Sequence, residues 1–159
     1  MGKHRIEGRA TARVGRDAVW PVLADITRWA EWGAWEVTQR EREGDPPPDG
    51  VGAKRMLRRG RIVSHEEVTA FEPPTRLGYR LVSGGLPVRG YTATVTLSDV
   101  GEGTEILWQA EFDGKFPLVG GLMRIGLGRF MQDAAERVAR EAERRAGEGA
   151  RSGSGGSAA

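Results

Sequence analysis

The 159-residue chain lacks cysteine and has only two histidines, His4 and His65. The absence of cysteine excludes disulfide bridges, thiolate catalysis and every zinc or iron–sulfur site that requires cysteine ligands. The second histidine of a zinc-binding helix is missing after His65. Phosphate-binding glycine loops, dinucleotide-binding glycine patterns and a serine nucleophile elbow are absent as well. We therefore predict no metal and no cofactor.

The chain also lacks an excess of charge of one sign. Its 24 Lys and Arg residues and 22 Asp and Glu residues leave a formal net charge of +2, which argues against a nucleic-acid partner. No apolar run of ~18 residues is present, so the sequence predicts no transmembrane segment. Because the first residues also lack the apolar stretch of a secretory signal, we expect a cytoplasmic protein.

The length of the chain is typical of one domain, since domains commonly have ~100–200 residues. We assign residues 1–146 to a single ligand-binding domain. Residues 147–159 are rich in glycine and serine and contain no large apolar residue. Such a segment cannot offset the entropy that it would lose on ordering, so we predict a flexible tail.

Alternation of apolar and polar residues, the pattern of a half-buried strand, dominates much of the chain. It predicts strands over residues 5–14, 35–39, 51–59, 61–71, 77–82, 91–97 and 104–112. Between the first two strands, Asp17 suits the N-cap of a short helix over residues 18–24, and a second short helix is expected over residues 26–31. Because the later strands have short connections, they should pair as an antiparallel meander.

The last element has a longer period, because apolar residues recur every three or four positions between residues 117 and 145. This spacing predicts one amphipathic helix. Glycines in its first half, such as Gly120 and Gly126, should each cost ~1 kcal/mol relative to alanine. They favour either a helix segment that gates a cavity or a close approach of helix and sheet. Residues 116–130 could alternatively lie on a membrane surface.

This order of elements resembles the SRPBCC superfamily, also called START-like, and in particular its polyketide cyclase/dehydrase and lipid-transport branch. The resemblance lies in residues 19–25 with 28–32, residues 71–81, and residues 91–97 with 103–108. It implies an α+β helix-grip fold, in which a curved antiparallel sheet wraps around a long C-terminal helix, with two short helices after the first strand. It also implies a hydrophobic ligand such as a polyketide or a lipid. Pro21 departs from the family pattern.

Large side chains on the predicted inner faces form the candidate binding site. Tyr and Trp combine an apolar body with a hydrogen-bonding tip, which suits a pocket for a flat, partly polar ligand. The alternative is that these side chains only fill the core. The candidate ligand-binding residues are Trp35, Met56, Tyr79, Tyr91, Trp108, Phe112, Met123 and Phe130.

His65 and Glu66 are the weak candidates for catalysis. Neighbours in a strand point to opposite faces, so only one of them can face a cavity, and the alternation permits either. A buried carboxylate would have a raised pKa and could move protons in an aldol cyclisation or a dehydration. The alternative is a solvated, charged strand face.

The leading prediction is binding of a small hydrophobic or aromatic molecule between the sheet and the long helix. One alternative is an enzyme, a polyketide aromatase/cyclase with Glu66 or His65 and a tyrosine as proton shuttle. Another is a partner-binding or chaperone-like module. The basic hairpin around Arg58 is predicted to be solvated, although an inward Arg55 or Arg80 could pair with a ligand carboxylate.

Overall fold

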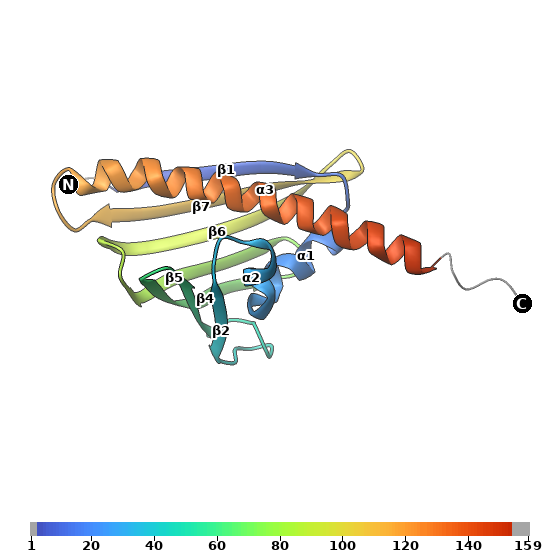
Figure 1. Cartoon of the computed structure of the whole chain (residues 1–159), viewed down its shortest axis with the longest axis horizontal. Coiled ribbons are helices and arrows are strands. Elements are labelled where there is room, and N and C mark those ends of the chain that lie inside the picture. Colours follow the sequence, from blue (N-terminus) through green and yellow to red (C-terminus); the bar gives the residue numbers. More distant parts are fainter. Residues whose placement is uncertain (1–2, 154–159) are drawn as a thin grey trace, which may run out of the picture.

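The computed structural model describes residues 3–153 and shows a curved, seven-stranded antiparallel sheet with a long helix lying along it (Figure 1). The elements are β1 (His4–Ala12), α1 (Arg16–Ala24), η1 (Ile26–Arg28), α2 (Trp29–Trp32), β2 (Val37–Arg42), β3 (Lys54–Arg59), β4 (Ile62–Glu72), β5 (Arg76–Gly84), β6 (Val88–Val100), β7 (Gly103–Gly114) and α3 (Val119–Gly153). The strand order is β1-β7-β6-β5-β4-β3-β2. The predicted α+β helix-grip fold is therefore confirmed.

The inner face of the sheet follows from the period-two pattern. On β6 the side chains of Tyr91, Ala93 and Val95 are buried, and on β7 the inward positions are continued by Trp108 and Phe112. The helix α3 packs against β1, β7 and α1 and covers that side of the inner face. The remaining inner face, on β3 to β5, lies beside the first half of α3.

A glycine on β1 permits the close approach of α3. A Cβ atom at Gly8 would lie 2.7 Å from backbone atoms of Met131 and Gln132. Any side chain at Gly8 would therefore push α3 away from the sheet. Gln132 also ties the two elements together, because its Oε1 accepts a hydrogen bond from Arg9 N at 2.8 Å.

The helix boundaries differ from the predicted ones. The N-cap of α1 is Gly15, with no side-chain cap, so the prediction of Asp17 as N-cap is wrong. The second short helix consists of η1 and α2, and the Asp25 side chain caps η1 by accepting from Thr27 N at 3.0 Å.

The helix α3 begins at Val119 rather than residue 117 and continues to Gly153 rather than residue 145. Residues 147–153 of the predicted tail are therefore helical, and residues 154–159 lie outside the described residues. Charge pairs at helical spacing, such as those of Arg144 with Glu141 and Glu148, stabilise this extension.

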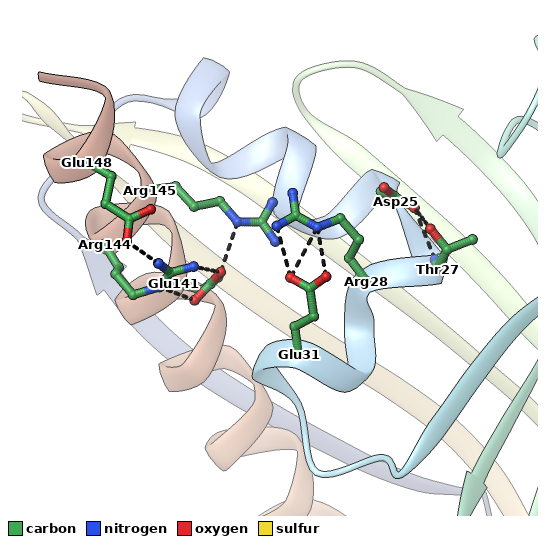
Figure 2. Close-up of polar contacts among 8 residues, drawn as sticks. All are labelled: Asp25, Thr27, Arg28, Glu31, Glu141, Arg144, Arg145 and Glu148. Carbon is green, nitrogen blue, oxygen red and sulfur yellow. Dashed lines mark hydrogen bonds and ion pairs between the residues drawn. The ribbon is translucent and has the colours of Figure 1, made fainter. Parts of the chain in front are cut away.

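An ionic cluster in the second half of α3 lies beside an ion pair between η1 and α2 (Figure 2). Glu141 is buried and accepts hydrogen bonds from Arg144 Nη2 at 2.7 Å and from Arg145 Nε at 2.9 Å. The Arg145 guanidinium lies beside the ion pair of Arg28 and Glu31, whose side chains are 2.9 Å apart. The hydrogen bond from Arg144, supported by Arg145, lowers the pKa of Glu141 to about 2 against the opposing effect of burial.

This cluster predicts a loss of stability in acid. The pKa of Glu141 in the folded protein, about 2, lies below its ordinary value of 4.5, so its contribution is present above pH 4.5 and is lost as the pH falls towards 2. Glu141→Gln should therefore lower the free energy of unfolding at pH 7 by ~1–2 kcal/mol. It should also flatten the pH dependence of stability, measured by chemical denaturation between pH 7 and pH 2.5.

Glu148→Gln is the matched control for this prediction. Its side chain is 64% exposed and pairs with the same Arg144, so its removal should change stability little at any pH. Equal effects of the two substitutions would contradict the role assigned to Glu141.

Candidate functional site

An apolar cavity of about 510 Å³ lies between the first half of α3 and the inner face of β3 to β6. Its volume is within the range of ~300–1,000 Å³ that is common for small-molecule sites. From the strands it is lined by residues that include Leu57, Ile62, Ser64, Glu66 and Leu81, and from the β5–β6 loop by Leu86. From α3 it is lined by residues that include Leu122, Ile125, Gly126 and Leu127. More open hollows of about 630 and 660 Å³ flank Arg5 and Glu7 on β1, but charged and other polar side chains dominate their walls. The apolar cavity is therefore the candidate site.

The structure brings part of the predicted residue set to this cavity. The residues of that set in the cavity wall are Trp35, Tyr79, Tyr91, Met123 and Phe130. They come from the segment before β2, from β5 and β6 and from α3, so parts of the chain that are far apart in the sequence build one wall. Whether they contact a ligand stays a prediction.

Three residues of the predicted set are not in the cavity wall. Met56 alternates with the inward Leu57 and so points to the other face of the sheet. Trp108 and Phe112 are inward but lie on β7, the strand against which α3 packs, where they are 2% and 1% exposed. The two buried side chains pack in the core beside the cavity, so none of the three residues lies in its wall.

Glu66, rather than His65, faces the cavity. Glu66 shares the inward phase of Ile62, Ser64 and Val68 on β4. His65 lies on the opposite face, where its Nδ1 is 2.6 Å from Glu41 Oε1 on β2. His65 is therefore excluded as the residue that acts inside the cavity. Among the described residues no group of three or more His, Asp or Glu side chains is placed to hold a metal ion.

A buried ion pair supports the inner end of the cavity. Arg55 on β3 lies directly opposite Glu66 on β4, and its Nε donates to Glu66 Oε2 at 2.9 Å. Arg55 Nη2 is 2.9 Å from the same oxygen but without hydrogen-bonding geometry. The guanidinium also lies 4.4 Å from the ring centres of both Trp29 and Tyr79. Arg55, 2% exposed, is thus held by one anion and two aromatic faces.

The sequence pointed to this pair only indirectly. We predicted a solvated basic hairpin, with an inward Arg55 or Arg80 as a way to bind a ligand carboxylate. Arg55 is inward, but its partner is the protein's own Glu66, and Arg80 pairs with Glu67 at 3.0 Å on exposed surface. The strand register is the feature of the sequence from which the pair can be predicted, because a β3–β4 hairpin that turns at Gly60 sets Arg55 opposite Glu66.

Burial governs the electrostatics of the cavity's polar groups. Burial raises the pKa of Glu66 above its ordinary value of 4.5, and the charge and hydrogen bond of Arg55 oppose the rise. Burial, followed by the negative charge of Glu66, raises the pKa of Tyr79, and burial raises that of Tyr91 well above 10. Both phenols are therefore neutral donors at physiological pH.

The two tyrosines lie beside each other in the cavity wall, and one of them is hydrogen-bonded to the core. Tyr79 OH accepts a bond from Trp108 Nε1 at 2.9 Å, which fixes the phenol from the β7 side. The ring centres of Tyr79 and Tyr91 are 6.5 Å apart. This arrangement can hydrogen-bond a polar group of a ligand, and with Glu66 it can move a proton to or from that group.

A curved antiparallel sheet wrapped around a long C-terminal helix, with an apolar cavity between them, defines a START-like helix-grip protein. Residues 3–143 match the family described as polyketide cyclase / dehydrase and lipid transport, so the chain belongs to this family. The predicted membership of the SRPBCC superfamily is thereby confirmed.

Solved structures share this fold at low sequence identity. A START superfamily protein from Mycobacterium smegmatis is similar with a TM-score of 0.77 at 11% identity, over 89% of this chain and 98% of that chain. The Zhui aromatase/cyclase from Streptomyces sp. R1128 has a TM-score of 0.76 at 20% identity, over 91% and 96%. Curated protein sequences give no significant match. Among the described residues, no helix combines the length and the apolar character needed to cross a membrane.

The buried ion pair predicts a large effect of removing one partner. Arg55→Met leaves the Glu66 carboxylate buried without a cation, and the free energy of unfolding should fall by ~3–5 kcal/mol. The double variant Arg55→Met/Glu66→Leu removes both charges and should recover most of that loss. Urea denaturation of the two variants and the wild type measures both effects.

The pH dependence of the single variant provides a second test. Without Arg55, the folded-state pKa of Glu66 rises further above 4.5, so stability should decrease as the pH rises from 4.5 to neutral. The double variant should not show this trend. A single variant as stable as the wild type would contradict the assignment.

Proposed function

We propose that the protein binds a small hydrophobic or aromatic molecule, such as a polyketide, a lipid or a related metabolite, in the cavity under α3. The observation that carries this proposal is the cavity itself: about 510 Å³ of space with mainly apolar and aromatic walls and a few polar groups at its inner end. A filled core would leave no such space, and a partner-binding module would have no need of it. The family description, which includes lipid transport, supports the same class of ligand.

The polar groups limit what the cavity can accept. Glu66, Tyr79 and Tyr91 line its wall together. Buried donors and acceptors are costly when they are left unpaired, so a ligand with matching oxygen or nitrogen atoms should be preferred over a pure hydrocarbon. An aromatic or alkyl body with one or a few carbonyl or hydroxyl groups fits this requirement.

Filling the cavity should abolish binding. Leu81 lines the cavity from β5, so Leu81→Trp should weaken binding of the uncharged probe N-phenyl-1-naphthylamine by at least about tenfold. Probe fluorescence, titrated against folded protein, measures this change. The neighbouring Val82 is 48% exposed and is not in the cavity wall, so Val82→Trp is the matched control. Equal affinities of the two variants would refute cavity binding.

The second candidate function is a polyketide aromatase/cyclase. The observation that favours it is a buried carboxylate in the same wall as two neutral phenols. In an aldol cyclisation, Glu66 would remove a proton from a methylene group between two carbonyls, and the resulting enolate carbon would form a bond to a further carbonyl carbon. The oxygen of that carbonyl would then take up the proton from Glu66. Tyr79 or Tyr91 would hydrogen-bond the oxygen on which negative charge develops.

This candidate predicts that binding and turnover separate. Tyr91→Phe keeps the shape of the cavity, so the affinity for N-phenyl-1-naphthylamine should be unchanged, whereas cyclisation of a linear poly-β-keto thioester should slow by ~10²-fold. Product formation is followed by liquid chromatography with mass spectrometry. If the wild type forms no cyclised product above the uncatalysed background, the enzyme function is refuted while ligand binding still stands.

A further inference from the structure

The mouth of the cavity differs from its inner end in charge. Lining residues that are largely exposed mark where the cavity opens: Leu122 is 72% exposed, Ile125 52% and Ile62 44%. The exposed side chains of Arg59 and Arg129 line the cavity as well. An apolar opening on β3, β4 and α3 thus carries guanidinium groups from both the sheet and the helix.

Neither guanidinium has a carboxylate partner within residues 3–153. Arg59 instead lies over the Phe130 ring, 5.4 Å from its centre, which places it between the end of β3 and α3. Two of the nearby acids are already engaged. Glu36 binds Arg58 at 3.1 Å, and Asp133, one turn along α3 from Arg129, binds Arg137 at 2.6 Å.

The charges deeper in the cavity are balanced. Glu66 is the acidic side chain in the described cavity wall, and Arg55 neutralises it. The cavity therefore has a compensated inner end and an uncompensated cationic mouth. An anionic group would meet no uncompensated cation at the inner end, whereas Arg59 and Arg129 would attract it at the mouth.

We propose that the ligand is an amphipathic anion, whose carboxylate or phosphate group lies at the mouth between Arg59 and Arg129 while its apolar body fills the cavity. This inference rests on the proposed ligand-binding function and adds the chemical class and the orientation of the ligand. Guanidinium groups suit this role because they bind carboxylate and phosphate oxygens through paired hydrogen bonds. The phenols of Tyr79 and Tyr91 then meet the far end of the ligand.

The test compares ligands that differ only in the head group. Dodecanoate, dodecyl phosphate, 1-dodecanol and dodecylammonium are titrated by displacement of N-phenyl-1-naphthylamine from the wild type. The two anions should bind at least about tenfold more tightly than the alcohol, and the cation should bind most weakly. Higher salt should reduce this preference because the mouth is exposed. A preference for only one of the two anions identifies the head group.

Three variants test whether the preference for anions arises at the mouth: Arg59→Gln, Arg129→Gln and the double variant. Each single substitution should reduce the preference for dodecanoate over 1-dodecanol. The double variant should bind dodecanoate and 1-dodecanol with similar affinity. Arg61→Gln removes the same charge two residues from Arg59, outside the cavity wall, and should keep the preference. Thermal unfolding of each variant verifies the fold.

The outcomes separate this inference from the function on which it rests. If the wild type binds 1-dodecanol as tightly as dodecanoate, or if the double variant keeps the preference, the cationic mouth has no role and the inference is wrong, although cavity binding stands. If the wild type binds neither N-phenyl-1-naphthylamine nor any dodecyl compound, both proposals fail.

Discussion

The fold depends on how one buried cation is accommodated. Arg55 is almost without solvent contact, and a guanidinium cannot lose its charge there, so the surrounding structure must stabilise it. Glu66 supplies the anion, and the rings of Trp29 and Tyr79 cover its two sides. These partners come from α2, β4 and β5, so a single side chain on β3 contacts three other elements and holds α2 against the sheet. The same residues support the inner end of the cavity, which makes the stability of the fold and the position of the site inseparable.

The cavity exists because α3 covers only part of the inner face. Close contact is confined to β1 and β7, where Gly8 lets the helix backbone approach the sheet. Beside the first half of α3, no helix or strand of residues 3–153 fills the space over β3 to β5 that forms the cavity. Side chains of Leu122 and Ile125 therefore lie at the border between cavity and solvent instead of in a packed core. The glycines in the first half of α3 differ in this respect: a Cβ atom at Gly121 or Gly126 would meet nothing within 4 Å, whereas one at Gly120 would clash with the His4 ring.

Local periodicity predicted the strands, the long helix and the inward side of most strands, because each of these is a property of adjacent residues. It could not show that Tyr79 lines the cavity whereas Trp108 does not, because this difference depends on which strands α3 covers. It also left the phase of β4 open, because His65 and Glu66 are both polar and bulges interrupt the β4–β5 pairing around them. The end of α3 was predicted too early, since a glycine-rich composition concealed charge pairs that stabilise the last turns.

The arrangement of the tryptophans has an optical consequence. The Trp29 ring lies 5.5 Å from that of Trp32, 5.1 Å from that of Trp35 and 5.8 Å from that of Trp108. Indole rings this close couple their excited states, so absorbed energy is shared within the cluster and near-ultraviolet circular dichroism reports on the cluster as a unit. Trp35 forms part of the cavity wall, whereas the other three do not. A molecule that touches Trp35 alone therefore perturbs the signal of the whole cluster, and the protein carries its own reporter of whether the cavity is occupied.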